Sequence, residues 1–226
     1  MSKTSKKYIV VYTDGSCAGN GKTGAVGGIG IHFPNGELKD ISKIFKNGCC
    51  TNQRAELYAI LTALRYIKQN LGLSQNKVCI KTDSQYSIDC VTKWVYGWIK
   101  NGWMTKNNTP VANKEFIELI HKYYENYDIV FDHIEAHTGL DDKESVANAI
   151  ADKLATMATK KAQKEFNDQY DQYGQFDQYG QYNQNDQPKK NNHNYNRQTY
   201  YKQKIKTKQG YPNDANIIVE LIKNPK

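Results

Sequence analysis

Three short apolar segments near the start of the chain have the composition and alternation of β-strands. They span residues 7–13, 28–33 and 38–45, and turns that contain glycine separate them. Short runs of β-branched and aromatic residues between turn residues are typical of strands. We therefore predict an antiparallel meander of three strands.

The period of the apolar positions changes at residue 52. Leucine and isoleucine recur at helical spacing at positions 57, 60, 61, 64 and 67, and Gly72 supplies a stop, so we predict a helix over residues 52–71. Residues 77–82 and 128–134 then read as strands, and residues 84–98, 113–124 and 145–157 as helices. The order βββαβααβα predicts an α/β domain with a central mixed five-stranded sheet flanked by helices.

Beyond Thr159 the apolar periodicity stops, and Gln, Asn, Tyr, Asp and Lys dominate. This composition cannot bury enough apolar surface to offset the conformational entropy of ordering, so we expect a disordered tail. Residues 215–222 are apolar again, enough for one short element that docks on the domain or on a partner. We predict a domain over residues 1–160, a low-complexity basic tail over 161–210 and a short apolar segment over 211–226.

The formal net charge of +8 favours polyanionic partners such as nucleic acid. Residues 160–226 hold twelve Lys and Arg against seven Asp and Glu, a net charge of +5. Tyrosines interleaved with basic residues suit loose contact with nucleic acid. The same composition equally suits a segment that contacts another protein, self-associates or only solvates the chain.

The cysteines and the apolar segments of the chain predict its cellular compartment. The odd number of cysteines, without a Cys-x-x-Cys spacing, predicts a reduced intracellular protein without structural zinc, in cytoplasm or nucleus. The apolar run near the N-terminus is too short for a signal peptide or a membrane span. We expect a soluble monomer with no membrane partner and no small-molecule cofactor.

Four acidic residues stand where metal chemistry would need them. Asp14 and Asp83 each follow a predicted strand, Glu56 lies at the margin of the apolar stripe of the helix over residues 52–71, and Asp152 lies among alanines in the last helix. If the two strands are neighbours, the four carboxylates can meet. Clustered carboxylates repel one another unless a cation neutralises them, and all-oxygen ligands suit Mg²⁺ or Mn²⁺. Each acid taken alone is better explained as an ordinary turn or surface residue.

Five motifs, in this order along the chain, resemble the type 1 ribonuclease H family. They are Thr13-Asp-Gly-Ser-Cys17 with Asn20, Thr51-Asn-Gln-Arg-Ala-Glu-Leu57, Thr82-Asp-Ser-Gln85, Ala136-His-Thr-Gly139, and the segment from Asn148 to Asp152. The resemblance covers about residues 7–158. It implies the ribonuclease H fold and an endonuclease that hydrolyses the RNA strand of RNA–DNA hybrids without sequence preference, leaving 5′-phosphate and 3′-hydroxyl ends.

The resemblance also implies roles for the acids. Asp14, Glu56, Asp83 and Asp152 would ligate two Mg²⁺ ions, for which Mn²⁺ is a possible substitute, with Asp14 bridging both ions. His137 matches a mobile histidine that helps to move protons or release product. Its distance of 15 residues from Asp152 exceeds the usual spacing of the family, so a surface histidine without a role stays an alternative.

The positions implied to bind substrate fall into two groups. On the RNA side they are Cys17, Asn20, Asn52, Gln53 and Gln85; on the DNA side they are Tyr86, Trp94, Lys100 and Lys106, with Thr51 and Asn113 in a phosphate pocket. Cys49 stands where close relatives have an arginine. Thr51 and Asn52 also suit helix capping, and we expect Trp98 and Trp103 in the core.

Two rival functions are considered. A non-catalytic hybrid-binding scaffold on the same fold would not need all four acids, which are present. A nuclease that works with a polymerase supplied in trans stays open.

Overall fold

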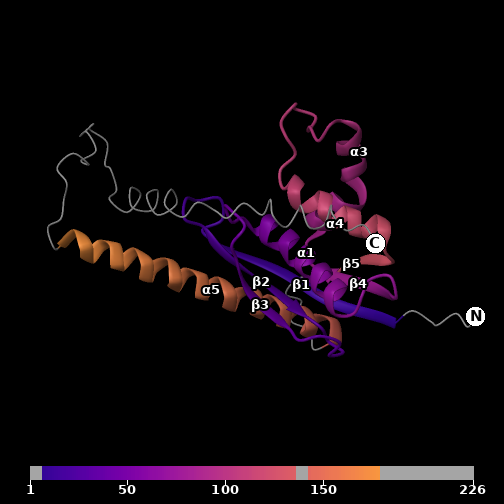
Figure 1. The fold of residues 1–226 in the computed structure, drawn as a ribbon, viewed down its shortest axis with the longest axis horizontal. Coiled ribbons are helices and arrows are strands. Elements are labelled where there is room, and N and C mark those ends of the chain that lie inside the picture. The colour runs from indigo at the N-terminus through magenta and orange to yellow at the C-terminus, as the bar shows by residue number, and fades with distance from the viewer. Residues whose placement is uncertain (1–6, 136–141, 179–226) are drawn as a thin grey trace, which may run out of the picture. The chain divides into compact units, whose positions relative to one another are not determined.

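The computed structural model describes residues 7–135 and 142–178, with side chains described up to residue 168 (Figure 1). The chain divides into two compact units, residues 1–45 with 49–167 and residues 46–48 with 168–226. The first unit holds the whole described sheet and the helices that cover it. No helix among the described residues is long and apolar enough to cross a membrane.

A five-stranded mixed sheet forms the centre of the first unit, as predicted. Its strands are β1 (Lys7–Ala18), β2 (Val26–His32), β3 (Ile41–Phe45), β4 (Asn76–Thr82) and β5 (Ile129–His133). Their spatial order is β3-β2-β1-β4-β5, with antiparallel pairs among the first three and parallel pairs of β1 with β4 and of β4 with β5. The parallel pairing of β1 with β4 brings the carboxyl ends of these two strands to the same edge.

The predicted strand bounds differ most from the observed ones in β1 and β3. β1 is longer than predicted, because its pairing with β2 continues to Ala18 after its pairing with β4 has stopped at Tyr12. β3 begins only at Ile41, because the carboxylate of Asp40 accepts hydrogen bonds from the backbone N–H of Phe33 and from the ring of His32 and so closes the preceding turn.

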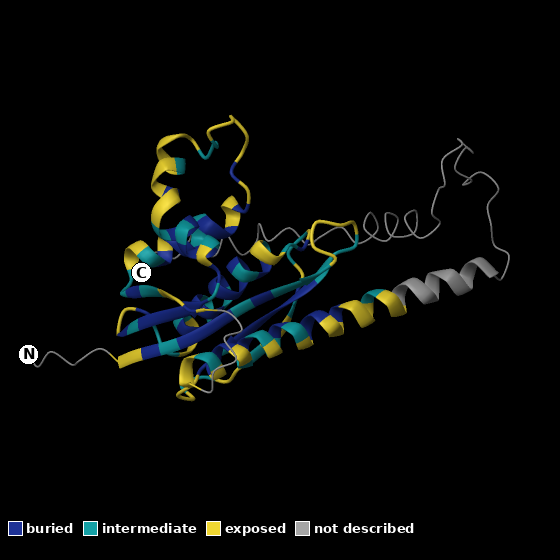
Figure 2. Ribbon diagram, turned by 180° about the vertical axis from the view of Figure 1, so that it is seen from behind, coloured by how far each residue is buried: buried dark blue, intermediate teal, exposed yellow. Residues whose placement is uncertain are grey.

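One face of the sheet is covered by α1 (Asn52–Asn70) and α4 (Lys114–Asn126). Thr51 caps α1, its hydroxyl accepting the N–H of Arg54, and the helix ends before Gly72, whose φ of 74° lets its N–H reach the carbonyl of Ile67. Its fully buried leucines and isoleucines pack on Ile9 and Val11 of β1 and Ile80 of β4, forming the main core seen in dark blue in Figure 2.

The opposite face is covered by α5 (Lys143–Gln178). Tyr12, Ile134, Ala147 and Ala151 form the small core between this helix and the sheet. The prediction that the helix ends at Met157 is wrong, because Ala158, Thr159 and Ala162 continue its buried stripe and the following Lys, Gln and Glu residues are good helix formers. The expected boundary at residue 160 therefore falls inside a helix. The predicted disorder of residues 179–226 lies outside the described residues.

The segment predicted as one helix over residues 84–98 contains three. These are α2 (Gln85–Asp89), the π-helical turn η1 (Cys90–Trp94) and α3 (Val95–Lys100). A π-turn widens the helix by one residue and often occurs near functional sites. The chain returns through residues 101–113, where Trp103, Asn108 and Asn113 have left-handed backbone conformations.

Candidate active site

The four predicted acids project from four different elements, and the register of the sheet places two of them side by side. Tyr12 of β1 pairs with Lys81 of β4 in parallel register. Asp14 and Asp83 each follow two residues later, so by the alternation of strand side chains both belong to the face that carries α5. Asp14 lies inside β1, at the point where only the pairing with β2 remains.

Gly15 brings the start of α1, and with it Glu56, close to β1. A Cβ at Gly15 would lie 2.1 Å from the backbone nitrogen of Glu56 and 2.2 Å from the carbonyl carbon of Ala55, so only glycine permits this approach. The Glu56 carboxylate accepts a short hydrogen bond from the hydroxyl of Ser84, the residue after Asp83. Glu56 is thereby held beside both strand ends.

Gly30 likewise permits the close approach of α5 to the sheet. It is the register partner of Asp14 on β2, and a Cβ there would lie 1.9 Å from the carbonyl oxygen of Ala151. Because Asp152 follows Ala151, the bare backbone of Gly30 lets the helix settle next to Asp14. All four acids are partly exposed.

The carboxylates act on one another electrostatically. Burial, together with the negative charges of Asp83, Asp152 and Glu56, raises the pKa of Asp14 from 3.8 to about 7, against a hydrogen bond from the Gly15 N–H. Burial also raises the pKa of Glu56, assisted by the charge of Asp83 and opposed by the hydrogen bond from Ser84. The structure therefore brings together the four acids that the sequence predicted, in a site with an excess of negative charge.

The chemistry of this donor set fits a divalent cation. All four groups offer carboxylate oxygens, which hard cations such as Mg²⁺ prefer, and a cation would remove the repulsion that raises the pKa of Asp14. Within the part of the chain that the structure describes, no group of three or more His, Cys, Asp or Glu side chains is placed so that it could hold a metal ion.

Two contacts around the site were not predicted from the sequence. Lys81, two residues before Asp83, pairs with Asp132 of β5 and Glu144 of α5. The ring of His133 is hydrogen-bonded to the backbone carbonyl of Asp83, with 3.2 Å between Nε2 and the oxygen. A lysine near the end of an otherwise buried strand was the available signal for the first contact, and none was available for the second.

The implied RNA-side positions lie around the start of α1. The backbone N–H of Asn52 donates to Oδ1 of Asn20 at 3.2 Å, which joins two of the predicted positions. Asn52, Gln53 and Gln85 are exposed, and Gln85 donates to Asp89. Cys17 is half-buried at the end of β1. These polar groups lie on the segments that carry Asp14, Glu56 and Asp83.

The implied DNA-side positions form a connected set. Nδ2 of Asn113 donates to the hydroxyl of Tyr86 at 3.1 Å, and the ring of Tyr86 meets that of Trp94 edge to face at 6.1 Å. Arg54, which the sequence argument had not singled out, donates from Nη1 to Oδ1 of Asn113 at 3.3 Å and pairs with Glu115 at 2.6 Å. Thr51 is fixed as the cap of α1. The positively charged side chain of Arg54 therefore lies beside Asn113 of the predicted phosphate pocket, although position 49 is a cysteine.

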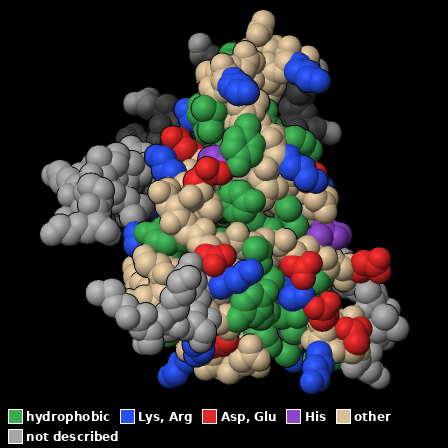
Figure 3. All heavy atoms as spheres, turned by 90° about the vertical axis from the view of Figure 1, so that its right-hand side faces the viewer, with side chains coloured by type: hydrophobic (Ala, Val, Ile, Leu, Met, Phe, Trp, Pro, Cys, Tyr) green, Lys and Arg blue, Asp and Glu red, His purple; other side chains and the backbone are tan. Residues whose placement is uncertain are grey.

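The segment from Trp94 to Lys106 projects from the body of the unit (Figure 1). Trp94 is 45% exposed, and Lys100 and Lys106 are exposed. Trp98 and Trp103 are only partly buried but pack against the core, close to the expectation for them. On the face drawn in Figure 3, acidic and basic side chains lie beside one another instead of forming one charged patch.

His137 and its loop, residues 136–141, lie outside the described residues. The structure resumes at Asp142, whose carboxylate accepts the backbone N–H groups of Glu144 and Ser145 at 2.9 and 3.0 Å and so caps α5. Part of the acidic insert that separates His137 from Asp152 thus starts a helix.

The fold and the acid constellation define a nuclease-like α/β domain with a candidate metal centre. The family description RNase H matches residues 6–160, and the chain belongs to the ribonuclease H family. It is 57% identical over 147 residues to a probable ribonuclease H of Acanthamoeba polyphaga mimivirus, covering 65% of this chain and 64% of that protein. It is 36% identical over 157 residues to human ribonuclease H1, covering 69% and 51%.

Solved structures agree with the sequence relatives. A type 1 ribonuclease H that carries a type 2 active-site motif superposes with a TM-score of 0.54 at 26% identity, covering 71% of this chain and 76% of that one. This likeness confirms the predicted fold class. The match spans about two thirds of the mimivirus protein and half of the human one.

Proposed function

We propose that this protein is a divalent-cation-dependent endonuclease that hydrolyses the RNA strand of RNA–DNA hybrids. The observation that carries the proposal is that Asp14 is largely buried near Asp83, Asp152 and Glu56, so that burial first and then these three charges raise its pKa. Membership of the ribonuclease H family supports the same conclusion. An acid cluster of this kind suits phosphodiester hydrolysis assisted by a pair of metal ions.

In this proposal Asp14, Glu56, Asp83 and Asp152 would hold two Mg²⁺ ions, for which Mn²⁺ could substitute. When bound, the cations would supply a more acidic water and a stabilised leaving oxygen, so that breaking the P–O3′ bond leaves 5′-phosphate and 3′-hydroxyl ends. Ser84 keeps the Glu56 carboxylate in place through its hydroxyl, and the Gly15 N–H holds Asp14. His137 is proposed to move a proton or to help release product.

The substrate is proposed from the chemistry of the surrounding side chains. Asn20, Asn52, Gln53 and Gln85 offer amide donors and acceptors, which suit the 2′-hydroxyl groups in the minor groove of a hybrid. Trp94, Lys100 and Lys106 on the projecting segment suit a DNA strand, through stacking and phosphate contacts. Because these groups do not read base edges in a code, cutting is expected at any sequence.

Further properties are part of the proposal. The five cysteines are free in the structure, which supports a reduced intracellular setting. We propose that the protein acts as a monomer, with the residues beyond the α5 helix adding nucleic-acid affinity.

A cleavage assay with four substrates tests the proposed function. An RNA–DNA hybrid with each strand labelled in turn, duplex DNA, duplex RNA and single-stranded RNA are incubated with the protein and Mg²⁺, and with EDTA as the control. We expect cutting of the RNA strand of the hybrid alone, and none with EDTA. Tight binding of the hybrid without cutting would support a non-catalytic binder instead.

A further inference from the structure

Lys81 joins three elements behind the acid cluster. It lies on β4 and is 9% exposed, on the sheet face that α5 covers. Its Nζ donates to Oδ2 of Asp132 on β5 at 2.7 Å and also to Oε1 of Glu144 on α5. The ring of Tyr12 on β1 lies 6.0 Å from the same nitrogen. One side chain thus contacts two neighbouring strands and the helix that carries Asp152.

Glu144 and Asp152 lie on the same stripe of α5. With Asn148 between them, they follow at intervals of four residues, so they share one face of the helix. Glu144 and Asp152 are separated by about 12 Å along the helix axis, at 1.5 Å per residue. Fixing Glu144 against β4 and β5 therefore limits both the rotation and the sliding of α5, and with them the position of the Asp152 carboxylate.

The apolar contacts of α5 before Asp152 are made by small side chains. Ala147 and Ala151 pack against Tyr12 and Ile134. After Asp152, the hydroxyl of Ser42 donates to the carbonyl of Leu154 at 2.7 Å, and that of Thr159 to the carbonyl of Ser16 at 3.1 Å. The Lys81 cluster ties the helix on the other side of Asp152.

A lysine that is nearly buried is costly unless it is paired and hydrogen-bonded. Lys81 meets that need with two carboxylates, each about half exposed, that come from separate elements. Because the buried charge must keep both partners, it favours one relative placement of β4, β5 and α5. Lys81 is two residues before Asp83, and the helix it holds carries Asp152, so both sides of the site depend on this placement.

We propose that Lys81 is a positioning residue of the metal site: through Glu144 it sets the distance of Asp152 from Asp14 and Asp83, and thereby the affinity for the divalent cation. The inference rests on the proposed function for its consequence in catalysis. Its geometric part, that Lys81 sets cation binding through Glu144, does not depend on which substrate is cut.

Binding of Mg²⁺ to the full chain without substrate, followed by calorimetry, tests the proposal directly. The variants are Lys81→Met, Glu144→Gln and the double variant. We expect Lys81→Met to weaken Mg²⁺ binding by about tenfold, the lower end of the range for residues that orient metal ligands. Because Lys81 acts through Glu144, the double variant should bind Mg²⁺ no more weakly than the weaker single variant.

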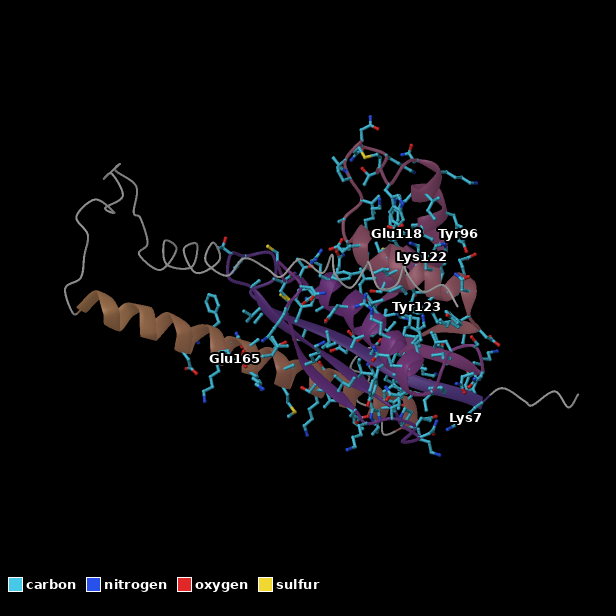
Figure 4. All side chains as sticks on the ribbon, in the orientation of Figure 1. Lys7, Tyr96, Glu118, Lys122, Tyr123 and Glu165 are labelled. Carbon is cyan, nitrogen blue, oxygen red and sulfur yellow. The ribbon has the colours of Figure 1, made fainter. Side chains whose placement is uncertain are left out.

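The control variant is Lys122→Met. Lys122 pairs with Glu118 at 3.6 Å on α4, on the sheet face opposite α5, and Figure 4 labels both residues. This variant loses a lysine and an ion pair without touching the site, and should leave Mg²⁺ binding unchanged. Lys81→Arg, which keeps the charge, should recover most of the affinity.

The outcomes separate this inference from the proposed function. If Lys81→Met lowers the melting temperature but binds Mg²⁺ within twofold of wild type, the lysine is only structural and the inference is wrong. Additive losses in the double variant would also overturn it, because Lys81 would then act by another route. If wild type binds Mg²⁺ but does not cut hybrid, the proposed function fails while the binding comparison still stands.

Discussion

Asp14 on β1 lies opposite Gly30 on β2. The backbone of α5 occupies the space that a side chain at Gly30 would need. A Cβ at this position would meet the backbone of Ala151 and Ala155, at 1.9 and 2.7 Å. Backbone atoms cannot turn aside as a flexible side chain can. The helix that carries Asp152 would have to move as a whole.

Gly30→Ala should therefore lower both stability and activity. Inserting a methyl group into a close-packed contact typically costs about 1–3 kcal/mol. Urea unfolding measures the stability, and cleavage of labelled hybrid measures the activity. Gly97→Ala is the matched control for stability, since a Cβ there meets nothing within 4 Å, and it should not lower the free energy of unfolding. Equal effects of the two substitutions would show that α5 does not depend on Gly30.

The raised pKa of Asp14 predicts how the cation-free protein responds to pH. Asp14 binds its proton more tightly in the folded state, with a pKa of about 7, than in the unfolded state near 3.8. Its contribution to the free energy of unfolding is therefore fully present below about pH 4 and lost as the pH rises through 7.

Asp14→Asn removes this dependence, because asparagine does not ionise. At pH 8 without divalent cations, the variant should melt at least about 2 °C above wild type, the shift that 1 kcal/mol produces in a domain of this size. The difference should shrink at pH 4 and on addition of Mg²⁺ to wild type at pH 8. Thermal unfolding followed by circular dichroism measures it. A variant that melts below wild type at pH 8 would show that Asp14 is not under electrostatic strain.

The projecting segment should bind DNA by two separable means. Trp94→Ala should weaken hybrid binding by about 1–3 kcal/mol, the usual value of a base stacked on an aromatic ring. Lys106→Ala should instead reduce the slope of log affinity against log salt by about one. Fluorescence anisotropy with a labelled hybrid at several salt concentrations distinguishes the two. A salt slope unchanged in Lys106→Ala means that this lysine contacts no phosphate.

The length of α5 makes the expected domain boundary testable. A chain ending at residue 168 keeps the buried Ala162, whereas one ending at residue 160 removes it. The shorter chain should melt several degrees lower, since each 1 kcal/mol corresponds to about 2–4 °C. Comparing the full chain with the chain ending at residue 168 isolates the remaining tail. Equal affinities for hybrid would exclude a role of that tail in binding nucleic acid.

The order and type of the elements could be predicted because each has its own period and its own turn residues. The four acids could be recognised because they stand in motifs that resemble the ribonuclease H family, although Asp14 lies inside β1 and does not follow it. The Lys81–Glu144 pair could not, since it depends on how far α5 slides along the sheet, a property of packing between segments 63 residues apart. The contact of Arg54 with Asn113 joins α1 to the residue before α4 and was missed for the same reason.

The extension of α5 shows a different limit of sequence reasoning. The residues after Met157 are mostly polar, so their composition suggested a tail. Only the structure shows that Ala158, Thr159 and Ala162 stay buried and keep the helix in place. A polar composition does not end a helix when a narrow stripe of small residues continues.

The central claim, that four carboxylates form one nuclease site, is tested most directly by neutralising each in turn. Asp14→Asn, Glu56→Gln, Asp83→Asn and Asp152→Asn are compared with Glu118→Gln, a partly buried acid on α4, for cleavage of hybrid with Mg²⁺ and for hybrid binding. We predict that the four site variants still bind hybrid but lose cleavage, while Glu118→Gln cuts as wild type does. Full cleavage by the Asp14→Asn variant would contradict the account.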